Sequence, residues 1–206
     1  MSLPNHASVV VIGGGIMGCS TLYHLAKFGA DAILLERNKL TSGTTWHSAA
    51  QVRALRSSQN LTRMIQYSVD LYSQLEAETG QSVGWIQEGS LSIATNDDRL
   101  TLIKRQEALA HAYGIEARSI SPGEAQERWP LMRSDDVIGA VWSPDDGRVS
   151  PSDVCAALVK GAKSLGAQLF EGTGVTGILT ENGKVKGVET TQGTVMCDAV
   201  ALCGGL

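Results

Sequence analysis

Three glycines near the start of the chain have the spacing of a phosphate-binding turn. Gly13, Gly15 and Gly18 fit the pattern G-x-G-x-x-G and follow the apolar run Val9–Ile12. The first glycine permits a sharp turn out of a strand, the second lets a pyrophosphate approach the backbone, and the third lets the next helix pack closely. Backbone N–H groups at the start of that helix would hold the phosphates. The pattern therefore predicts a dinucleotide site.

An acidic residue stands where ribose recognition would need it. Ser20–Lys27 has a helical pattern, Ala32–Leu35 is a short apolar strand, and Glu36 closes that strand. A carboxylate there would accept hydrogen bonds from both hydroxyls of an adenosine ribose and would repel a 2′-phosphate. Glycine clusters also occur in ordinary turns. It is this order of strand, helix, strand and carboxylate that favours dinucleotide binding over a Rossmann-like half without phosphates.

Two further segments are predicted to approach a ligand. The loop Thr41–Ala50 is rich in hydroxyls and longer than most connections from strand to helix, which is typical of a binding loop. Ala199–Cys203 is predicted to be a buried strand that runs into Gly204 and Gly205. Beside the first strand, these glycines would allow a second close backbone approach.

Helical periodicity and capping signals define the middle of the chain. A long helix is predicted from Ser57 or Ser58 to Gly80. Val83–Gln87 and Leu91–Thr95 are predicted to form a hairpin. Asn96 would then cap a helix that runs to about Tyr113, and a capping box with proline at the first helical position, Ser121–Glu124, would start a short helix that ends at Pro130.

The remaining segments predict an α/β fold that is interrupted once. A strand at Val137–Trp142 and a turn at Asp145–Gly147 precede a helix from Ser150 to Gly166 and a strand at Ala167–Phe170. Two β-rich runs, Val175–Thr180 and Val185–Thr190, are joined by the tight-turn signal Glu181–Lys184 and predict a β-meander. We expect a Rossmann-like domain with a parallel sheet and this meander, into which a second lobe is inserted.

Composition sets broad limits on the class of protein. With 206 residues, 43% hydrophobic residues and mixed charges, the chain is predicted to be globular with a sizeable core. A net charge of −4 gives no reason to expect nucleic acid or an anionic membrane as a partner. The four cysteines lack C-x-x-C spacing, which argues against a metal site or a disulfide framework and favours a reducing, cytoplasmic setting. Neither a signal peptide nor a membrane span is expected.

Four features resemble the FAD-dependent amine oxidoreductases of the D-amino-acid-oxidase superfamily, and most closely the dimethylglycine and sarcosine dehydrogenase group. They are the glycine pattern Gly13–Gly18, called the fingerprint below, the segment Leu34–Arg37, the run Thr41–His47, and Asp146–Pro151. The resemblance implies a FAD-binding domain at residues 1–82 and 151–206, with a partial α+β substrate lobe at 83–150. Chains of this family are longer, so this one is expected to be an N-terminal fragment of an N-methyl-amine dehydrogenase.

The resemblance also implies a set of cofactor contacts. In this family the histidine of the Trp-His motif carries the flavin covalently, which would make His47 the attachment residue; the alternative is that it only hydrogen-bonds its own loop. A neutral imidazole nitrogen is a competent nucleophile for such a bond. Trp46 would either lie along the flavin or act as a packing anchor. The predicted FAD-binding residues are Gly13, Gly14, Gly15, Ile16, Met17, Gly18, Glu36, Arg37, Gly43, Thr44, Thr45, Trp46, His47, Ser48, Ala49, Ala50, Val175 and Gly204.

The expected substrate is a small secondary or tertiary N-methyl amine such as dimethylglycine or sarcosine, which would lose a hydride to the flavin. Arg53 and Arg56 would either hold a substrate carboxylate or face solvent or phosphate. Neither a catalytic base nor an electron acceptor follows from the sequence, and folate would act only through a domain that this chain lacks. The alternatives are an NAD-dependent dehydrogenase with the same fingerprint and an inactive nucleotide-binding fragment.

Overall fold

The computed structural model describes residues 2–205 and divides into two compact units. Unit 1 runs up to Ala50, resumes over Gln74–Gly84 and resumes again from Ser150. Unit 2 comprises Gln51–Ser73 and Trp85–Val149. Residues 51–73 thus group with 85–149, whereas the sequence placed domain boundaries at 82/83 and 150/151. That division into functional domains remains a prediction.

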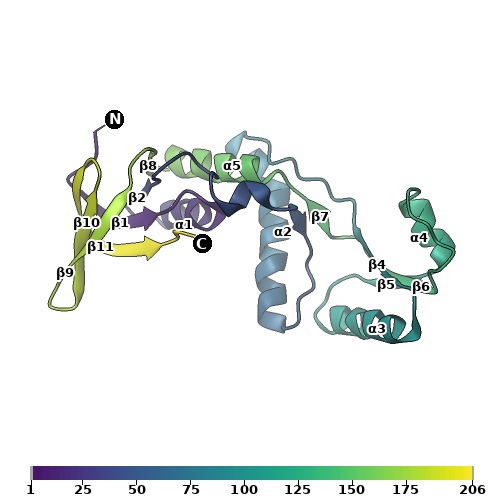
Figure 1. The fold of residues 1–206 in the computed structure, drawn as a ribbon. Coiled ribbons are helices and arrows are strands. Elements are labelled where there is room, and N and C mark those ends of the chain that lie inside the picture. The colour runs from purple at the N-terminus through teal and green to yellow at the C-terminus, as the bar shows by residue number, and fades with distance from the viewer. Residues whose placement is uncertain (1, 206) are drawn as a thin grey trace. The chain divides into compact units, whose positions relative to one another are not determined.

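Unit 1 is built on one six-stranded sheet with the order β8-β2-β1-β11-β10-β9 (Figure 1). The four strands β8, β2, β1 and β11 run parallel, as the alternation of strands and helices requires. Two helices of this unit, α1 and α5, pack against each other. The bounds are β1 His6–Ile12, α1 Ile16–Lys27, β2 Ala32–Leu35, α5 Pro151–Ser164, β8 Gln168–Phe170, β9 Val175–Glu181, β10 Lys184–Thr190 and β11 Gly193–Leu202.

The strand β11 belongs to both the parallel and the antiparallel part of this sheet. Its first residues pair antiparallel with β10, from Gly193 to Met196, and its later residues pair parallel with β1, from Met196 to Leu202. The observed strand is therefore longer than the predicted strand Ala199–Cys203, and it ends at Leu202. It is also less buried than expected, since Leu202 is 72% exposed. The expected combination of a parallel sheet and a β-meander is confirmed.

The hydrophobic core of unit 1 is formed by buried apolar residues of the six-stranded sheet. Val10, Ile33 and Val188 are at most 1% exposed and belong to one cluster. Between α1 and α5 the packing depends on a small residue, because a Cβ atom on Gly161 would lie 2.6 Å from the Tyr23 ring. The hydroxyl of Tyr23 donates to the carboxylate of Glu78, which also forms an ion pair with Lys27.

Unit 2 contains a three-stranded antiparallel sheet with the order β4-β6-β5 and a two-residue ladder between β3 and β7. Asn96 caps α3 by accepting from the Arg99 N–H, and the predicted capping box of Ser121 and Glu124 is present at α4. The bounds are β3 Gln51–Val52, α2 Gln59–Thr79, β4 Ser90–Ala94, α3 Asp97–Ala112, β5 Arg118–Ile120, α4 Pro122–Arg128, β6 Gly139–Ser143 and β7 Gly147–Arg148. Residues 74–79 of α2 belong to unit 1.

The hairpin predicted for Val83–Gln87 and Leu91–Thr95 is wrong. Residues 83–87 form no strand, and only Ile86 makes a single bridge, to Arg148. The strand β4 pairs instead with β6, about 50 residues further along the chain. Gly89 has φ 72° and its N–H donates to the Asp146 carbonyl, so the chain turns away at this point rather than folding back on itself.

One buried carboxylate ties the segments of unit 2 together. Asp146 is 3% exposed, and its Oδ1 accepts from the Ala54 N–H at 2.8 Å. Its Oδ2 accepts from the Ser90 hydroxyl at 2.5 Å and lies 3.6 Å from Nε of Arg53. The turn that the sequence predicted at residues 145–147 thus holds two other segments of the chain, one at Arg53 and Ala54 and one at Ser90.

Over residues 2–205, none of the helices combines the length and apolar character that crossing a membrane would require.

Candidate cofactor site

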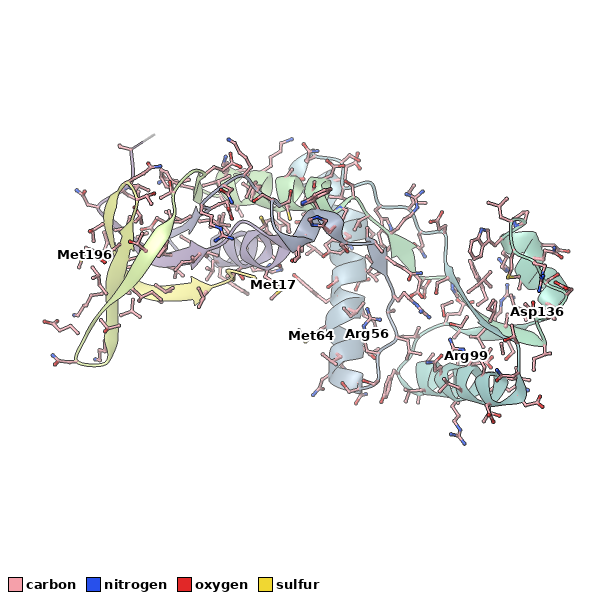
Figure 2. All side chains as sticks on the ribbon, in the orientation of Figure 1. Met17, Arg56, Met64, Arg99, Asp136 and Met196 are labelled. Atoms are coloured by element: carbon pink, nitrogen blue, oxygen red, sulfur yellow. The ribbon has the colours of Figure 1, made fainter. Side chains whose placement is uncertain are left out.

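A cleft of about 670 Å³ opens in unit 1 where β1 ends and α1 begins. Three segments far apart in the sequence form its walls: the fingerprint, the end of β2 with the loop that follows it, and the residues after β11. Met17, 68% exposed, stands at the first turn of α1 (Figure 2). The lining residues are Gly13, Gly14, Gly15, Ile16, Met17, Glu36, Arg37, Asn38, Ser42, Gly43, Thr44, Thr45, Leu202, Cys203, Gly204 and Gly205.

The glycines of the fingerprint are required by close backbone contacts. Gly13 has φ 111°, and a Cβ atom there would lie 2.4 Å from the carbonyl oxygen of Cys203. A Cβ atom on Gly18 would lie 1.8 Å from the carbonyl oxygen of Gly13. These contacts let α1 begin directly after β1 and let the segment after β11 pass over the turn, so backbone rather than side chains faces the cleft.

Glu36 is buried and held by backbone donors. Its Oε2 accepts from the Gly14 N–H at 2.6 Å, and its Oε1 accepts from the Asn38 N–H at 2.7 Å. The side chain is 8% exposed and lines the cleft. Each carboxylate oxygen has a second lone pair, so both can still accept from hydroxyl groups of a ligand.

The loop after β2 is fastened to the fingerprint at two points. The Thr41 N–H donates to the Gly14 carbonyl at 2.9 Å, and Oγ1 of Thr45 accepts from the Ile16 N–H at 3.1 Å. Between these bonds, Ser42 and Gly43 face the cleft. The loop therefore lies across the N-terminus of α1, where the helix dipole and its N–H groups favour a negative charge.

A short 3₁₀ helix, η1 (Thr44–His47), ends this loop. The Trp46 and His47 rings stack with centroids 3.9 Å apart and planes inclined by 37°. Nδ1 of His47 lies 3.1 Å from the carbonyl oxygen of Gly43, and both rings are exposed. Ser48 accepts from the Ala50 N–H at 3.1 Å and so closes the segment.

The cleft is lined by most, but not all, of the residues predicted to bind the cofactor. Among the residues described, Gly18 lies behind the turn, Val175 begins β9, and neither lines the cleft, nor does the stretch Trp46–Ala50. The lining residues that were not among the predicted FAD-binding residues are Asn38, Ser42, Leu202, Cys203 and Gly205. Position along the chain could have indicated all of them, because each adjoins or lies within a segment already predicted to approach the ligand.

Two buried thiols, those of Cys19 and Cys155, lie on the helices α1 and α5. Sγ of Cys19 donates to the Gly14 carbonyl at 3.6 Å. A hydrogen bond with Cys155, together with burial, raises the pKa of the Cys19 thiol above its ordinary value. Cys19 therefore stays protonated and serves as a small packing residue between α1 and α5.

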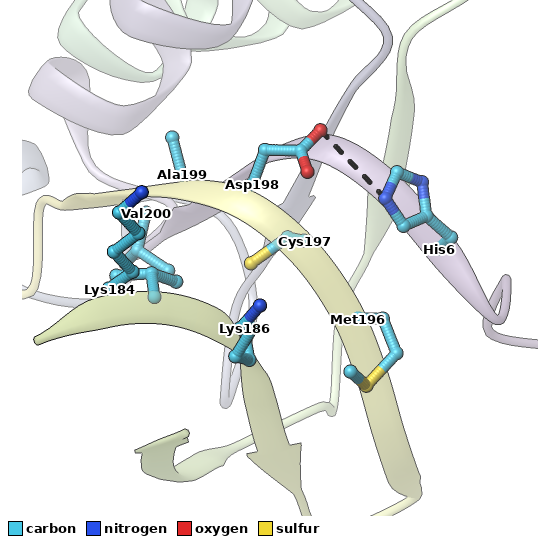
Figure 3. A pocket seen from close by; sticks show the side chains of 9 residues that line it. His6, Lys184, Lys186, Met196, Cys197, Asp198, Ala199 and Val200 are labelled. Atoms are coloured by element: carbon cyan, nitrogen blue, oxygen red, sulfur yellow. Dashed lines mark ion pairs between the residues drawn. The ribbon is translucent and has the colours of Figure 1, made fainter. Parts of the chain in front are cut away.

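Unit 1 has a second large cavity, of about 630 Å³, which does not share these features. It is lined by residues of β1, β10 and β11, among them Lys184, Lys186 and Cys197 (Figure 3). At its edge, Nε2 of His6 lies 3.9 Å from Oδ2 of Asp198. Because its walls are strand residues, this cavity presents no helix N-terminus to a phosphate.

The two arginines singled out by the sequence are engaged within unit 2. Arg53 pairs with Asp146, and its Nη2 donates to the Ser92 hydroxyl at 3.1 Å. Nη1 of Arg56 donates to the carbonyl of Leu55 at 2.9 Å. Both guanidinium groups thus have partners in the fold, a role that neither of the two sequence-based alternatives described.

Comparisons with known proteins agree with this geometry. Residues 8–206 match the family described as FAD dependent oxidoreductase. Mitochondrial sarcosine dehydrogenase of Mus musculus is 44% identical over 99% of this chain, and the mitochondrial pyruvate dehydrogenase phosphatase regulatory subunit of Mus musculus is 40% identical over all of it. The match covers 23% and 24% of those two proteins, so the chain spans about a quarter of their length.

A solved structure gives the same result for the fold. The crystal structure of L-proline dehydrogenase from P. horikoshii superposes with a TM-score of 0.93 at 33% identity, over 98% of this chain and 53% of that one. The expected FAD-binding α/β fold and the resemblance to the sarcosine dehydrogenase group are confirmed. The chain belongs to the family of FAD-dependent oxidoreductases.

Proposed function

We propose that the protein oxidises a secondary or tertiary N-methyl amine, such as sarcosine or dimethylglycine, with FAD as its cofactor. The observation that carries the proposal is the convergence of the fingerprint, Glu36 and residues 42–45 of the following loop on one cleft. The similarity to sarcosine dehydrogenase supports the choice of amine. The test is anaerobic mixing of the flavin-loaded protein with sarcosine or dimethylglycine: bleaching of the flavin spectrum is expected.

The residues around the cleft fit FAD. The N-terminus of α1 supplies N–H groups to a pyrophosphate, and a Cβ atom on Gly15 would lie 3.0 Å from Oγ1 of Thr45, so there the backbone can be approached closely only without a side chain. Glu36 supplies the two carboxylate oxygens that adenosine ribose hydroxyls need. When bound, FAD supplies the redox chemistry by accepting a hydride from the carbon next to the amine nitrogen.

Replacing Glu36 by alanine is expected to weaken FAD binding by about 1–3 kcal/mol, a roughly 5- to 150-fold rise in Kd, because charge-assisted hydrogen bonds to the ribose are lost. Quenching of flavin fluorescence measures Kd on the apoprotein. The matched control is Glu181→Ala, since that carboxylate is exposed on β9 outside the cleft. An unchanged Kd in the Glu36 variant would show that this carboxylate does not face the ribose.

We further propose that His47 carries FAD covalently, through its flavin 8α-methyl carbon. Support comes from the loop: Thr45 bonds to the start of α1, and His47 follows two residues later with its ring exposed. No other side chain of the loop is a comparable nucleophile, because the remaining polar groups are hydroxyls and the indole N–H of Trp46, which is only a donor.

Acid precipitation tests the attachment. Flavin fluorescence is expected to remain with the precipitated wild-type protein and to move to the supernatant in His47→Ala. His6→Ala is the control, since that imidazole lies on β1 away from the cleft. If the His47 variant retains covalent flavin, another residue is the attachment site.

A regulatory role is the second candidate function, because a relative 40% identical to the chain is named as a regulatory subunit. In that case the protein would hold flavin that no amine reduces. An NAD-dependent dehydrogenase, the earlier alternative, would show no flavin bands in its visible spectrum.

The cytoplasmic setting, the amine as the partner and the dependence of any folate reaction on another domain remain predictions. They rest on the resemblance to longer proteins, of whose length this chain spans about a quarter.

A further inference from the structure

We propose that Glu171 is a positioning residue for FAD: its carboxylate holds the loop after β2 in the conformation that receives the cofactor. Glu171 directly follows β8 and does not itself line the cleft. Its role concerns the binding of FAD, so it rests on FAD as the cofactor. It depends neither on the amine that is oxidised nor on covalent attachment.

The backbone after β8 is bonded to the backbone after β2. The Thr173 N–H donates to the Glu36 carbonyl at 2.8 Å, and the Gly172 N–H donates to the Asn38 carbonyl at 3.1 Å. These bonds continue the contact between the two parallel strands beyond their last residues. They place the side chain of Glu171 beside the start of the loop.

The carboxylate of Glu171 accepts from the backbone just before that loop. Oε1 accepts from the Leu40 N–H at 2.8 Å, and Oε2 lies 3.0 Å from Nζ of Lys39. Burial raises the pKa of Glu171, but the bonds from Leu40 and Lys39 outweigh it and hold this pKa below its ordinary value, so the acceptor is charged at pH 7. Because the side chain of Lys39 is 82% exposed, its ion pair contributes little. The bond from the Leu40 N–H is therefore the main restraint.

Leu40 connects this restraint to the fingerprint. Its side chain packs against Gly14, since a Cβ atom on Gly14 would lie 2.9 Å from Cδ2 of Leu40. The Gly14 N–H donates to Oε2 of Glu36 at 2.6 Å, and the Gly14 carbonyl accepts from the Thr41 N–H at 2.9 Å. A displacement of Leu40 would thus disturb both the carboxylate proposed to bind ribose and the loop at the N-terminus of α1.

The residue after Leu40 has a strained backbone that needs such support. Thr41 has φ 64°, in the left-handed region that a β-branched residue rarely adopts, and this conformation persists only where neighbouring contacts hold it. Its hydroxyl lies 3.2 Å from Oγ of Ser152, which is a second contact besides the bond to Gly14. Without Glu171, we expect Thr41 to relax toward negative φ and to carry residues 42–45 away from the cleft.

The experiment compares FAD binding in variants of the full-length protein. All are made in the His47→Ala background, which keeps binding reversible under the attachment proposed above, and quenching of flavin fluorescence gives Kd. We expect Glu171→Ala to raise Kd about 3- to 30-fold, because the Leu40 N–H loses a charged acceptor. Glu171→Gln keeps an acceptor oxygen and Lys39→Met removes only the ion pair, so both are expected to stay within about twofold of the parent.

Amide hydrogen exchange of the apoprotein separates positioning from general stability. In Glu171→Ala, residues 39–45 are expected to exchange faster, while exchange in the six-stranded sheet and the melting temperature stay at the parent's values. Glu181→Ala, which removes an exposed carboxylate outside the cleft, is the control and is expected to change none of these quantities.

Three results would each overturn the proposal. They are an unchanged Kd in Glu171→Ala, a rise in Kd as large in Glu171→Gln as in Glu171→Ala, and faster exchange throughout the sheet together with a lower melting temperature. If the wild-type protein binds FAD but neither sarcosine nor dimethylglycine reduces it, the proposed oxidation fails and the role of Glu171 stands. If the protein does not bind FAD, both fail.

Discussion

Replacing Gly18 by alanine is expected to destabilise the protein by about 3 kcal/mol or more and to abolish FAD retention. A Cβ atom at this position would lie 1.8 Å from the carbonyl oxygen of Gly13, and both groups belong to the backbone of the same turn. No side-chain rotation can relieve the overlap, so α1 must shift away from β1. That shift would displace the N–H groups that face the cleft.

Thermal unfolding and flavin content of the purified variant measure both effects. The melting temperature is expected to fall by about 6–12 °C for a chain of this size. Gly123→Ala is the matched control, because its Cβ atom would meet only Oγ of Ser121 at 3.9 Å and alanine favours the helix α4. If Gly18→Ala unfolds at the wild-type temperature with a full complement of flavin, the close crossing of strand and helix is not needed.

The second large effect is expected from Asp146→Ala, which should cost about 3 kcal/mol. The substitution removes the acceptor of the Ala54 N–H and the Ser90 hydroxyl and leaves Arg53 without its carboxylate. Two buried donors then remain unsatisfied. Urea unfolding of the wild type and the variant gives the difference in free energy.

The neighbouring Asp145 provides the control. Burial, and then the negative charges of Glu116 and Asp146, raise the pKa of Asp145 above its ordinary value. Its charged form is therefore disfavoured in the fold, so Asp145→Asn is expected to be neutral or slightly stabilising near pH 7. Similar losses in both variants would mean that the acidic turn as a whole, rather than the three contacts of Asp146, holds unit 2.

The elements that the sequence predicted well are those with local signals. The capping box at Ser121 contains its own partner three residues later, and the turn at Asn182 and Gly183 needs the positive φ angles, 50° and 73°, that these residue types adopt readily. The hairpin at Val83–Gln87 failed because the true partner of β4 is distant in sequence. Alternation of residues in one strand carries no information about which strand it pairs with.

The residues of the candidate site also fall into two groups: those predicted from local spacing and those that depend on contacts the spacing does not show. Gly13 and Glu36 were predicted because their roles follow from spacing along one unit of strand, helix and strand. Cys203 was not assigned a contact because its approach to Gly13 depends on the pairing of β1 with β11. The contact between the Gly43 carbonyl and the His47 ring was not predicted either, because it depends on η1. A 3₁₀ turn of four residues leaves no periodic pattern in the sequence.

The pairing of β1 with β11 also has a consequence for how the molecule forms during synthesis. Every partner pair between these strands is separated by 190 residues, from His6 with Met196 to Ile12 with Leu202. Closing so long a loop is entropically costly, and it must await nearly all of the described chain. The strands of unit 2, by contrast, pair within Gln51–Val149. During synthesis on the ribosome, unit 2 can therefore fold while the glycine turn still lacks its partner strand β11. Cofactor binding is then expected only after β11 has been synthesised.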